Sequence, residues 1–416
     1  MTDKESPKYG KLSRYITDPL YKNSFYLTLN RVFNAGTGLV FWVVAAWFYS
    51  VSDIGIASAL ISSLAIVMHF SRFGFDFTMI RYISHYDKSD LFSTCIMLTT
   101  LGTFIVAPLY LVSIDYISPS ISFLKDYALI FIAIAVLNSV TLSSGNGFLA
   151  LRMAELKFYQ NVLLGLRIPF LLPFMVSGSL GILFATGLAY LVSTAAAMYQ
   201  MMKYLTIKIK INWNIVKETY HFSSMNYIGN LFLFLPVRFI PIIALNLLGA
   251  EEAGVLFIVM TLIAMLFIIP EAMSFSLFVE GSHGENLVKT TYKALGATYA
   301  VVLPAVVIFF FFGDIFLGWF GPEYANGFDL LRIMSISTLF AVIHYFFVPI
   351  QNIRMKLGSV VLINFIYCIL LVGLGYFFMS EFGIIGLGYA YNLTFIALGL
   401  ISAIFAMRVI RSGKII

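Results

Sequence analysis

Long apolar runs recur along this chain and determine the environment in which it can fold. Twelve stretches of roughly 18 to 25 mostly apolar residues follow one another, each long enough as a helix to cross the ~30 Å hydrocarbon core of a bilayer. Prolines inside such runs are tolerated in membrane helices when neighbouring groups satisfy the freed carbonyls. The predicted spans are 24–49, 54–72, 91–112, 127–150, 159–177, 181–202, 222–247, 254–278, 295–317, 328–350, 359–379 and 383–407.

Composition excludes a soluble protein of this size. Sixty per cent of the 416 residues are apolar and only 11% are charged, too few charges to cover a soluble surface. The net charge of +6 comes from short segments between apolar runs, so no continuous basic patch points to nucleic acid. The expected fold class is an all-α membrane protein of about twelve transmembrane helices.

The charges between the spans predict the orientation of the chain. Alternate connections hold 21 lysine and arginine residues on one side and only Lys125 on the other. Such a bias in short loops places the basic side, with both termini, in the cytoplasm of a cell inner (plasma) membrane. The acidic residues expected on the opposite side are Asp53, Asp115, Asp126, Glu251, Glu252, Asp314, Glu323, Asp329 and Glu381.

The two halves of the chain resemble each other weakly but in register. Residues 52–55 match 251–254, residues 151–153 match 353–355, and Gly181-Ile182 matches Gly383-Ile384, at offsets of 199, 202 and 202. A duplicated unit of six helices predicts two parallel lobes around a central cavity, an arrangement typical of transporters. The expected domains are a tail (1–22), an N-terminal lobe (23–204), a basic amphipathic linker on the inner leaflet (205–221), a C-terminal lobe (222–408) and a tail (409–416).

Four arginines fall inside predicted spans. Arg332 lies near a span end, where it can reach water or pair with Asp329. Arg31, Arg167 and Arg238 lie deeper, where an unpaired charge costs at least ~2.5–3.5 kcal/mol and normally faces a partner or a wet cavity. They could neutralise buried acids, but only Asp76 and Glu271 lie near membrane depth. We therefore expect at least two of the three deep arginines to bind an anion, since a guanidinium suits phosphate oxygens.

Polar side chains near these arginines extend the candidate site. Asn30 and Asn34 lie beside Arg31, and the offset of 199 maps Arg31 onto Asn230. Their amides could hold sugar hydroxyls, or they could bond helix to helix, which is the commoner use of membrane asparagine. The candidate substrate-binding residues are Arg31, Arg167, Arg238, Asn30, Asn34 and Asn230.

A candidate gate follows from the same repeat. The offset of 199 maps Arg72 onto Glu271, and equivalent positions face each other across a two-fold-like axis. The two side chains are expected to approach when the lobes close on the cytoplasmic side. The alternative is local pairing of Arg72 with Asp76 one turn on. His69 and His344, without neighbouring carboxylates, are expected to pack as neutral rings.

The opening segment YLTLNRVFNAGTGLVFWVVAAWFYSVSDIGIASALISSLA and its counterpart NLLGAEEAGVLFIVMTLIAMLFIIPEAMS carry a family resemblance. A polar, Arg-containing first helix, a short loop ending in Gly and an Ala/Ser-rich second helix resemble the polysaccharide-export flippases related to the O-antigen flippases. Their superfamily, the multidrug/oligosaccharidyl-lipid/polysaccharide transporters, also holds MATE-type multidrug exporters and the lipid II flippase. The resemblance implies a polyprenyl-(pyro)phosphate-linked oligosaccharide flipped from the inner to the outer leaflet by alternating access.

Three rival classes fit the residues less well. A drug or cation antiporter of the same superfamily would want an acid where Arg31 stands. A major facilitator would show a Gly/Arg-rich signature in FDFTMIRYISHYDKSDLFS, which is not there, and a membrane glycosyltransferase would need catalytic acids and a large loop. We therefore expect no enzyme, catalytic residue, cofactor or metal. The expected partners are the lipid-linked oligosaccharide and membrane lipids, with a polysaccharide polymerase and glycosyltransferases as candidates from the polysaccharide biosynthesis that the resemblance implies.

Overall fold

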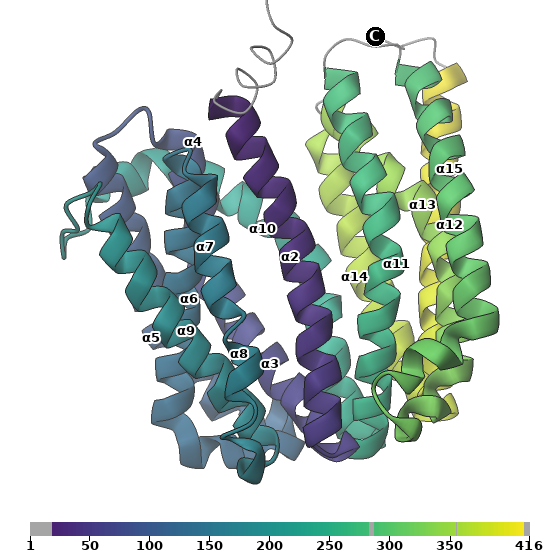
Figure 1. Ribbon diagram of the computed structural model, residues 1–416. Helices are drawn as coiled ribbons and strands as arrows, with labels where there is room; N and C mark the ends of the chain where they lie inside the picture. The colour runs from purple at the N-terminus through teal and green to yellow at the C-terminus, as the bar shows by residue number, and fades with distance from the viewer. Residues whose placement is uncertain (1–18, 283–286, 355, 412–416) are drawn as a thin grey trace, which may run out of the picture.

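The protein is a bundle of long helices (Figure 1). The computed structural model describes residues 19–282, 287–354 and 356–411, and within these ranges eleven helices are long and apolar enough to cross a membrane. The all-α fold class is confirmed. The long helices are α2 (Pro19–Phe48), α3 (Val51–Arg72), α5 (Lys88–Ile117), α6 (Ala128–Ala150), α9 (Ser179–Met201), α10 (Trp213–Leu248), α11 (Ala250–Ser282), α12 (Leu287–Gly318), α13 (Phe328–Ile353), α14 (Leu357–Phe382) and α15 (Ile385–Arg411).

Short elements complete the path. The helix α4 (Phe75–Tyr82) joins α3 to α5, and the short 3₁₀ helices η1 (Pro119–Tyr127) and η3 (Pro322–Gly327) precede α6 and α13. The end of the bundle at which α2 begins is called the inner end below, because the sequence predicts that it faces the cytoplasm. The opposite end is the outer end.

The fifth predicted span, 159–177, is not one helix. It consists of α7 (Ala154–Leu164), α8 (Arg167–Phe170) and the single turn η2 (Met175–Ser177). Gly165 weakens the helix between α7 and α8, and Pro169 and Pro173 lack the backbone N–H that would continue it. Interrupted backbone at membrane depth is tolerated where it lies within protein or lines a cavity. The expectation of a continuous helix here was wrong, and the break is where Arg167 lies.

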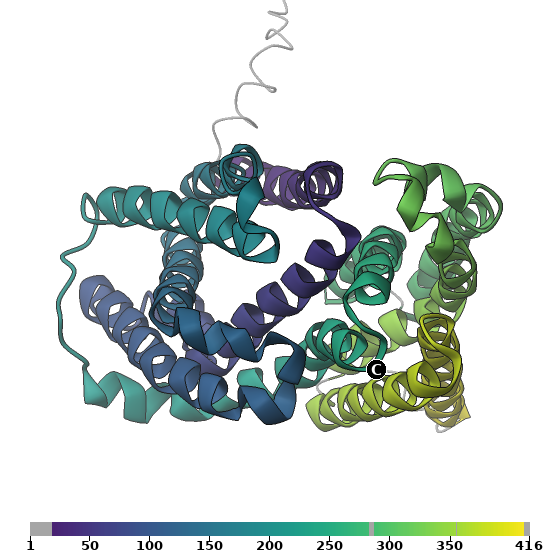
Figure 2. The same ribbon diagram turned by 90° about the horizontal axis from the view of Figure 1, so that it is seen from below.

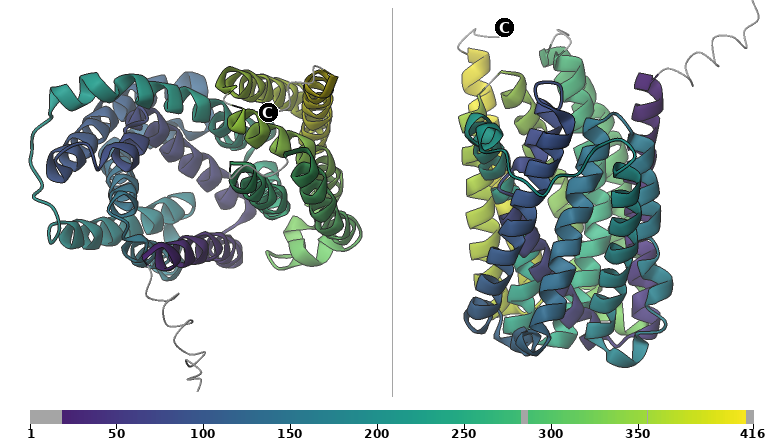
Figure 3. Two further views of the ribbon diagram at one scale, coloured as in Figure 1. Left: turned by 90° about the horizontal axis from the view of Figure 1, so that it is seen from above. Right: turned by 90° about the vertical axis from the view of Figure 1, so that its left-hand side faces the viewer.

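The two-lobe prediction is visible when the bundle is viewed along its axis (Figures 2 and 3). Helices α2–α9 form one group, and α11–α15 form the other. The repeat also appears in local geometry: Gly178 before α9 and Gly383 before α15 have φ of 54° and 60°. A Cβ on Gly181 would meet the Phe174 carbonyl at 2.1 Å, and one on Gly386 would meet the Phe378 carbonyl at 2.0 Å. Gly178 is therefore the counterpart of Gly383, so the predicted match of Gly181 to Gly383 was three residues off.

The lobes meet most closely where α3 crosses α11 near the outer end. A Cβ on Gly55 would lie 1.9 Å from the Ala250 carbonyl oxygen, and one on Gly254 would lie 2.1 Å from the Val51 carbonyl oxygen. These glycines are equivalent under the predicted offset of 199, so equivalent positions do face each other here. A continuous apolar core passes through this crossing, with Ile54 of α3 and Leu256 of α11 fully buried in it.

Towards the inner end the two lobes diverge on the side formed by α2 and α11. Helices α2 and α11 lie close together at the outer end and apart at the inner end (Figure 1). At the outer end the Trp47 indole donates to the Trp319 carbonyl at 2.8 Å, and Asn246 donates to the Ile117 carbonyl at 2.9 Å. The bundle is therefore closed at its outer end along α2 and α11.

Helix α10 joins the lobes on the opposite side. It begins at Trp213, within the stretch expected as linker, and its first half packs against α3 and α4, where Ser223 and Thr78 share a hydrogen bond. It also packs against α14, where Asn364 donates to the Gly229 carbonyl at 3.3 Å.

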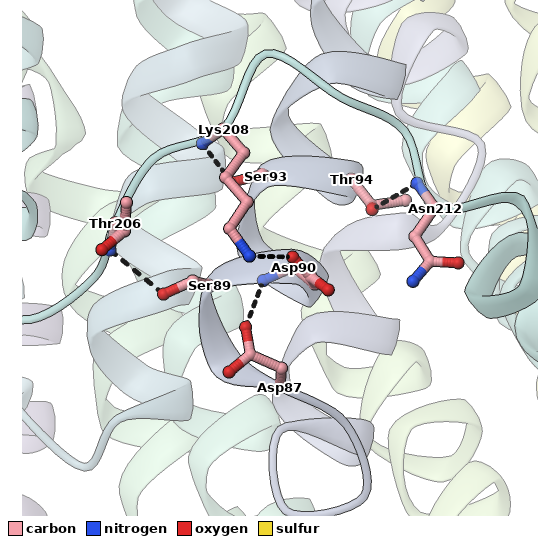
Figure 4. Close-up of polar contacts among 8 residues, drawn as sticks. All are labelled: Asp87, Ser89, Asp90, Ser93, Thr94, Thr206, Lys208 and Asn212. Carbon is pink, nitrogen blue, oxygen red and sulfur yellow. Dashed lines mark hydrogen bonds and ion pairs between the residues drawn. The ribbon is translucent and has the colours of Figure 1, made fainter.

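The non-helical connection before α10 is attached to the first turns of α5 (Figure 4). The backbone N–H groups of Thr206, Lys208 and Asn212 donate to the hydroxyls of Ser89, Ser93 and Thr94 at 2.9–3.0 Å. The Lys208 ammonium also donates to Asp90, and this hydrogen bond raises the pKa of the lysine, so the pair stays charged at neutral pH. The connection therefore belongs physically to the N-terminal lobe.

Candidate functional site

A cavity of about 350 Å³ lies inside the N-terminal lobe. Helices α2, α3 and α6–α9 line it, and α10 and α11 each contribute one side chain, Arg238 and Phe257. Most of a substrate in this cavity would therefore contact one lobe. The polar residues of the lining are Ser58, Ser62, Asn138, Thr141, Lys157, Gln160, Asn161, Arg167, Thr186, Tyr190 and Arg238.

Arg167 enters the cavity from the interrupted fifth span. Its guanidinium carbon lies 4.6 Å from the centre of the Phe41 ring, a cation–π contact with α2. A Cβ at Gly38 would lie 3.9 Å from Nη2, so the glycine leaves room for the guanidinium beside α2. The ring contact stabilises the cation while leaving N–H groups for a ligand, because a π face accepts no full hydrogen bond from them.

Arg238 reaches the same cavity from α10. Its guanidinium carbon lies 5.5 Å from the Phe234 ring centre. The Tyr190 side chain of α9 lies within electrostatic range of both Arg167 and Arg238. The Nε atoms of both arginines are buried and have no hydrogen-bond partner among the described residues. The structure thus brings together two of the three deep arginines singled out from the sequence.

The cavity is cationic. Arg167, Arg238 and Lys157 line it, and its lining contains no Asp or Glu among the residues that the structure describes. Low-dielectric surroundings strengthen the attraction of these charges for an anion. Paired arginines with unsatisfied N–H groups suit phosphate oxygens, which guanidinium groups bind in a bidentate manner. Such a lining disfavours a cationic ligand.

A second cavity has the opposite polarity. It measures about 490 Å³, lies at the outer end and is lined by Trp47, Glu251 and Glu323 among others. Its carboxylates repel anions, so it is no alternative site for a phosphate. The two cavities together place positive charge within the N-terminal lobe and negative charge at the outer end.

The asparagines expected beside Arg31 have different surroundings. Asn30 is buried and accepts a hydrogen bond from Asn161 of α7, so it joins two helices. Asn34 and Asn230 are exposed and lie outside the cavity lining. Helix-to-helix bonding, the alternative weighed for these amides, is present at Asn30. Sugar binding by Asn30, Asn34 and Asn230 stays a prediction.

Arg31 lies at the interface of the lobes and not in the cavity. Its guanidinium carbon is 5.3 Å from the ring centre of Phe275 on α11, and its side chain is exposed. It therefore reaches across the interval between α2 and α11. A contact with substrate at this position stays a prediction.

The proposed gate residues are apart in this conformation. Arg72 donates to Asp76 at 2.8 Å and contacts His69 Nδ1 at 3.3 Å, so the local pairing considered from the sequence is present. Glu271 is exposed on α11. Approach of Arg72 and Glu271 when the inner ends close stays a prediction.

Arg332 and the two imidazoles behave as structural groups. Arg332 lies 3.5 Å from Asp329 and donates to the Phe310 carbonyl at 3.0 Å. His69 stacks on Phe234 at 4.2 Å, and His344 is 4% exposed among aromatic rings.

Lys157 and Gln160 line the cavity and were not singled out from the sequence. Lys157 was assigned to a cytoplasmic connection because α7 begins five residues earlier than the predicted fifth span. The signal that could have found them is their spacing: residues 157, 160, 161 and 164 recur at intervals of three and four, and all four face the cavity.

Comparison with known proteins places the fold. No family model matches the chain, and no curated protein matches its sequence. Solved structures do match: an inward-facing multidrug resistance MATE family transporter of the MOP superfamily superposes with a TM-score of 0.72 at 13% identity, covering 94% of this chain and 99% of that one. The lipid II flippase MurJ in an inward closed conformation gives 0.73 at 12% identity, covering 92% and 87%.

A third match comes from Pyrococcus furiosus. This MOP superfamily transporter, whose binding pocket has reversed polarity, superposes with a TM-score of 0.64 at 15% identity and covers 99% of this chain and 100% of that one. At these identities the likeness establishes a common fold. The chain is therefore similar in fold to transporters of the MOP superfamily.

Proposed function

We propose that this protein is a flippase that moves a polyprenyl-(pyro)phosphate-linked oligosaccharide from the inner to the outer leaflet for assembly of cell-surface polysaccharide. The observation that carries the proposal is the convergence of Arg167 and Arg238 on a cavity whose described lining has no carboxylate. The phosphate groups are the natural ligands of the two arginines. Hydroxyls and amides of the same lining can hold sugar.

The proposed mechanism is alternating access by movement of the two lobes. The closed outer end and the divergence of α2 and α11 at the inner end fit a state open to the cytoplasm. Among the MATE family superpositions, the TM-score is 0.72 on an inward-facing structure and 0.65 on an outward-facing one, which supports this assignment. In this state the cavity takes up its substrate from the inner leaflet.

The lipid tail has a path on the same side. Helices α2 and α11 approach each other much less than α3 and α11 do, so the tail can pass between them into the membrane while the head group lies in the cavity. Arg31 lies along this path and would contact the phosphate during its passage. When the inner ends close, pairing of Arg72 with Glu271 would seal the cavity from the cytoplasm.

Export of cationic drugs is the alternative, because MATE family transporters have this fold. A cation needs a carboxylate or an electron-rich cavity, whereas the lining here presents three cations. Charge therefore favours the lipid-linked anion over the cationic drug.

A deletion strain tests the proposal. We expect loss of surface polysaccharide and accumulation of the polyprenyl-linked glycan on the inner leaflet, with unchanged tolerance of the cationic dye ethidium. Wild-type protein should restore export, and Arg332→Gln should restore it as well, because Arg332 lies away from the cavity. Normal surface polysaccharide together with lost ethidium tolerance would contradict the proposal and support drug export.

A further inference from the structure

Lys157 occupies a defined position at the inner part of the cavity. Its Nζ atom donates to Asn146 Oδ1 at 3.4 Å, and a Cβ at Gly145 would lie 3.6 Å from it. Both neighbours belong to α6, close to its inner end at Ala150. The ammonium therefore lies against a part of α6 where a glycine leaves space for it.

This lysine has no close counter-ion. Within the described parts of the chain, no carboxylate lies within 4.0 Å of Nζ. Asp76 is the carboxylate whose charge acts on Lys157, but Asp76 is already bound by Arg72 at 2.8 Å. One carboxylate facing two cations leaves a net positive charge at this end of the cavity. An uncompensated cation inside a membrane protein is costly unless an anion joins it.

The lysine and the arginine pair hold their charges at different places in the cavity. Lys157 lies on α7, whereas Arg167 lies on α8, beyond the break in the span. Their head groups also lie against different helices, since Lys157 contacts α6 whereas Arg167 lies beside Gly38 of α2. An anion held beside α2 by Arg167 would therefore leave the ammonium beside α6 unsatisfied.

Neutral hydrogen-bonding groups lie around the lysine. The Gln160 amide donates to the Thr141 carbonyl at 2.7 Å and to Ser144 Oγ at 2.9 Å, which leaves its Oε1 as an acceptor. That oxygen lies 2.9 Å from the position of a Gly145 Cβ, on the same side as the Lys157 ammonium. An ammonium beside an acceptor oxygen matches a carboxylate beside a hydroxyl, the combination that an acidic sugar carries.

We propose that Lys157 forms a second anion subsite, which binds the carboxylate of a hexuronic acid in the transported glycan. This inference rests on the proposed function, in which Arg167 and Arg238 hold the pyrophosphate. Lysine suits the role because it acts as a point charge and requires no bidentate geometry. The substrate class becomes a polyprenyl-pyrophosphate glycan with an acidic sugar close to the phosphate.

Binding of three synthetic lipids to the purified protein tests the subsite. The probes are polyprenyl pyrophosphate without sugar, with one glucose and with one glucuronic acid. We expect the glucuronate lipid to bind about tenfold more tightly than the glucose lipid, or about 1.4 kcal/mol. Lys157→Gln should abolish this difference without changing binding of the sugar-free lipid, and Lys157→Arg should keep part of it. Equal binding of the two sugars by wild type, or an unchanged difference in Lys157→Gln, overturns the subsite.

Two controls separate this inference from the proposed function. If wild type does not bind the sugar-free lipid, the proposed function fails, whereas normal binding of that lipid without a glucuronate preference overturns only the subsite. Phosphatidylglycerol vesicles added as competitor test for an anionic head group: displacement of the glucuronate lipid from wild type but not from Lys157→Gln would assign Lys157 to membrane lipid instead. Thermal unfolding of the variants verifies that each is folded.

Discussion

The two lobes share one architecture and differ in what fills their centres. The N-terminal lobe encloses a hydrophilic cavity with three cations. The corresponding part of the C-terminal lobe is packed with aromatic rings, in which Phe267, Tyr391 and Phe395 lie with ring centres 5.4–6.3 Å apart. The two lobes therefore share an arrangement of helices but differ in the residues at their centres.

Residues at equivalent positions of the two lobes show where the difference lies. The offset of 202 pairs Gly145, beside the Lys157 ammonium, with Phe347, which is 5% exposed in the core. The offset of 205 that Gly178 and Gly383 establish pairs the cavity residue Tyr190 with the buried Phe395. A glycine replaced by phenylalanine converts space into packed core. The comparison teaches that the cavity depends on small side chains as much as on charges.

The fifth span of each lobe shows the same contrast. In the N-terminal lobe this span is broken and presents Arg167 to the cavity, whereas its counterpart α14 is an unbroken helix. At offsets of 202–205, the positions equivalent to Arg167 are the apolar residues 369–372. Interrupted helices are common where transporters bind their substrates. We therefore propose that the substrate binds in the N-terminal lobe and that the C-terminal lobe moves against it.

The largest effect should come from giving the N-terminal lobe the residue of its counterpart. Gly145→Phe would place its Cβ 2.9 Å from Gln160 Oε1 and fill the space beside Lys157, so we expect export to be lost. Export of the surface glycan, compared at equal amounts of inserted protein, measures this. Gly373→Phe is the matched control, because no atom lies within 4 Å of a Cβ there. Normal export by Gly145→Phe would show that this space is not used.

A smaller effect is expected at the crossing of the lobes. Gly55→Ala directs a methyl group at the Ala250 carbonyl, 1.9 Å away, and such overpacking typically costs about 1–3 kcal/mol. The outer end should then open more often. In a protein with Cys95 and Cys368 replaced by Ser, a cysteine at Ser52 should react several-fold faster with an impermeant thiol reagent added from outside.

The control for the crossing is Gly36→Ala, because a Cβ at Gly36 has no atom within 4 Å. Equal labelling rates in Gly55→Ala, in the control and in the parent protein would mean that the glycine crossing does not hold the outer end closed.

Much of the fold could be predicted from the sequence because membrane burial imposes strict rules on length and charge. Hydropathy located the spans, and the repeat correctly placed Gly55 opposite Gly254. The break in the fifth span was missed, since hydropathy does not report where Gly165 and Pro169 interrupt a helix. The beginning of α10 at Trp213 likewise depends on packing against α3 and α4.

The candidate site was predicted in part, because the membrane also restricts where charged side chains can lie. The cost of a buried charge singled out Arg167 and Arg238, and the structure brings both to one cavity. The same rule could not separate them from Arg31, because the rotation of a helix about its axis decides whether an arginine faces a cavity or a neighbouring lobe. Lys157 escaped notice because the boundary of its helix was placed two residues beyond it.

The most direct test of the central claim measures binding of polyprenyl pyrophosphate to purified protein. We expect Arg167→Gln and Arg238→Gln each to weaken binding about tenfold or more, since a hydrogen bond to a charged group contributes about 1.5–3 kcal/mol. Lysine at either position should restore only part of the affinity, because lysine keeps the positive charge but lacks the planar guanidinium that binds two phosphate oxygens at once. Arg332→Gln should bind as wild type does. Unchanged affinity in both cavity variants would contradict the account, because it would remove the N-terminal cavity as the phosphate site.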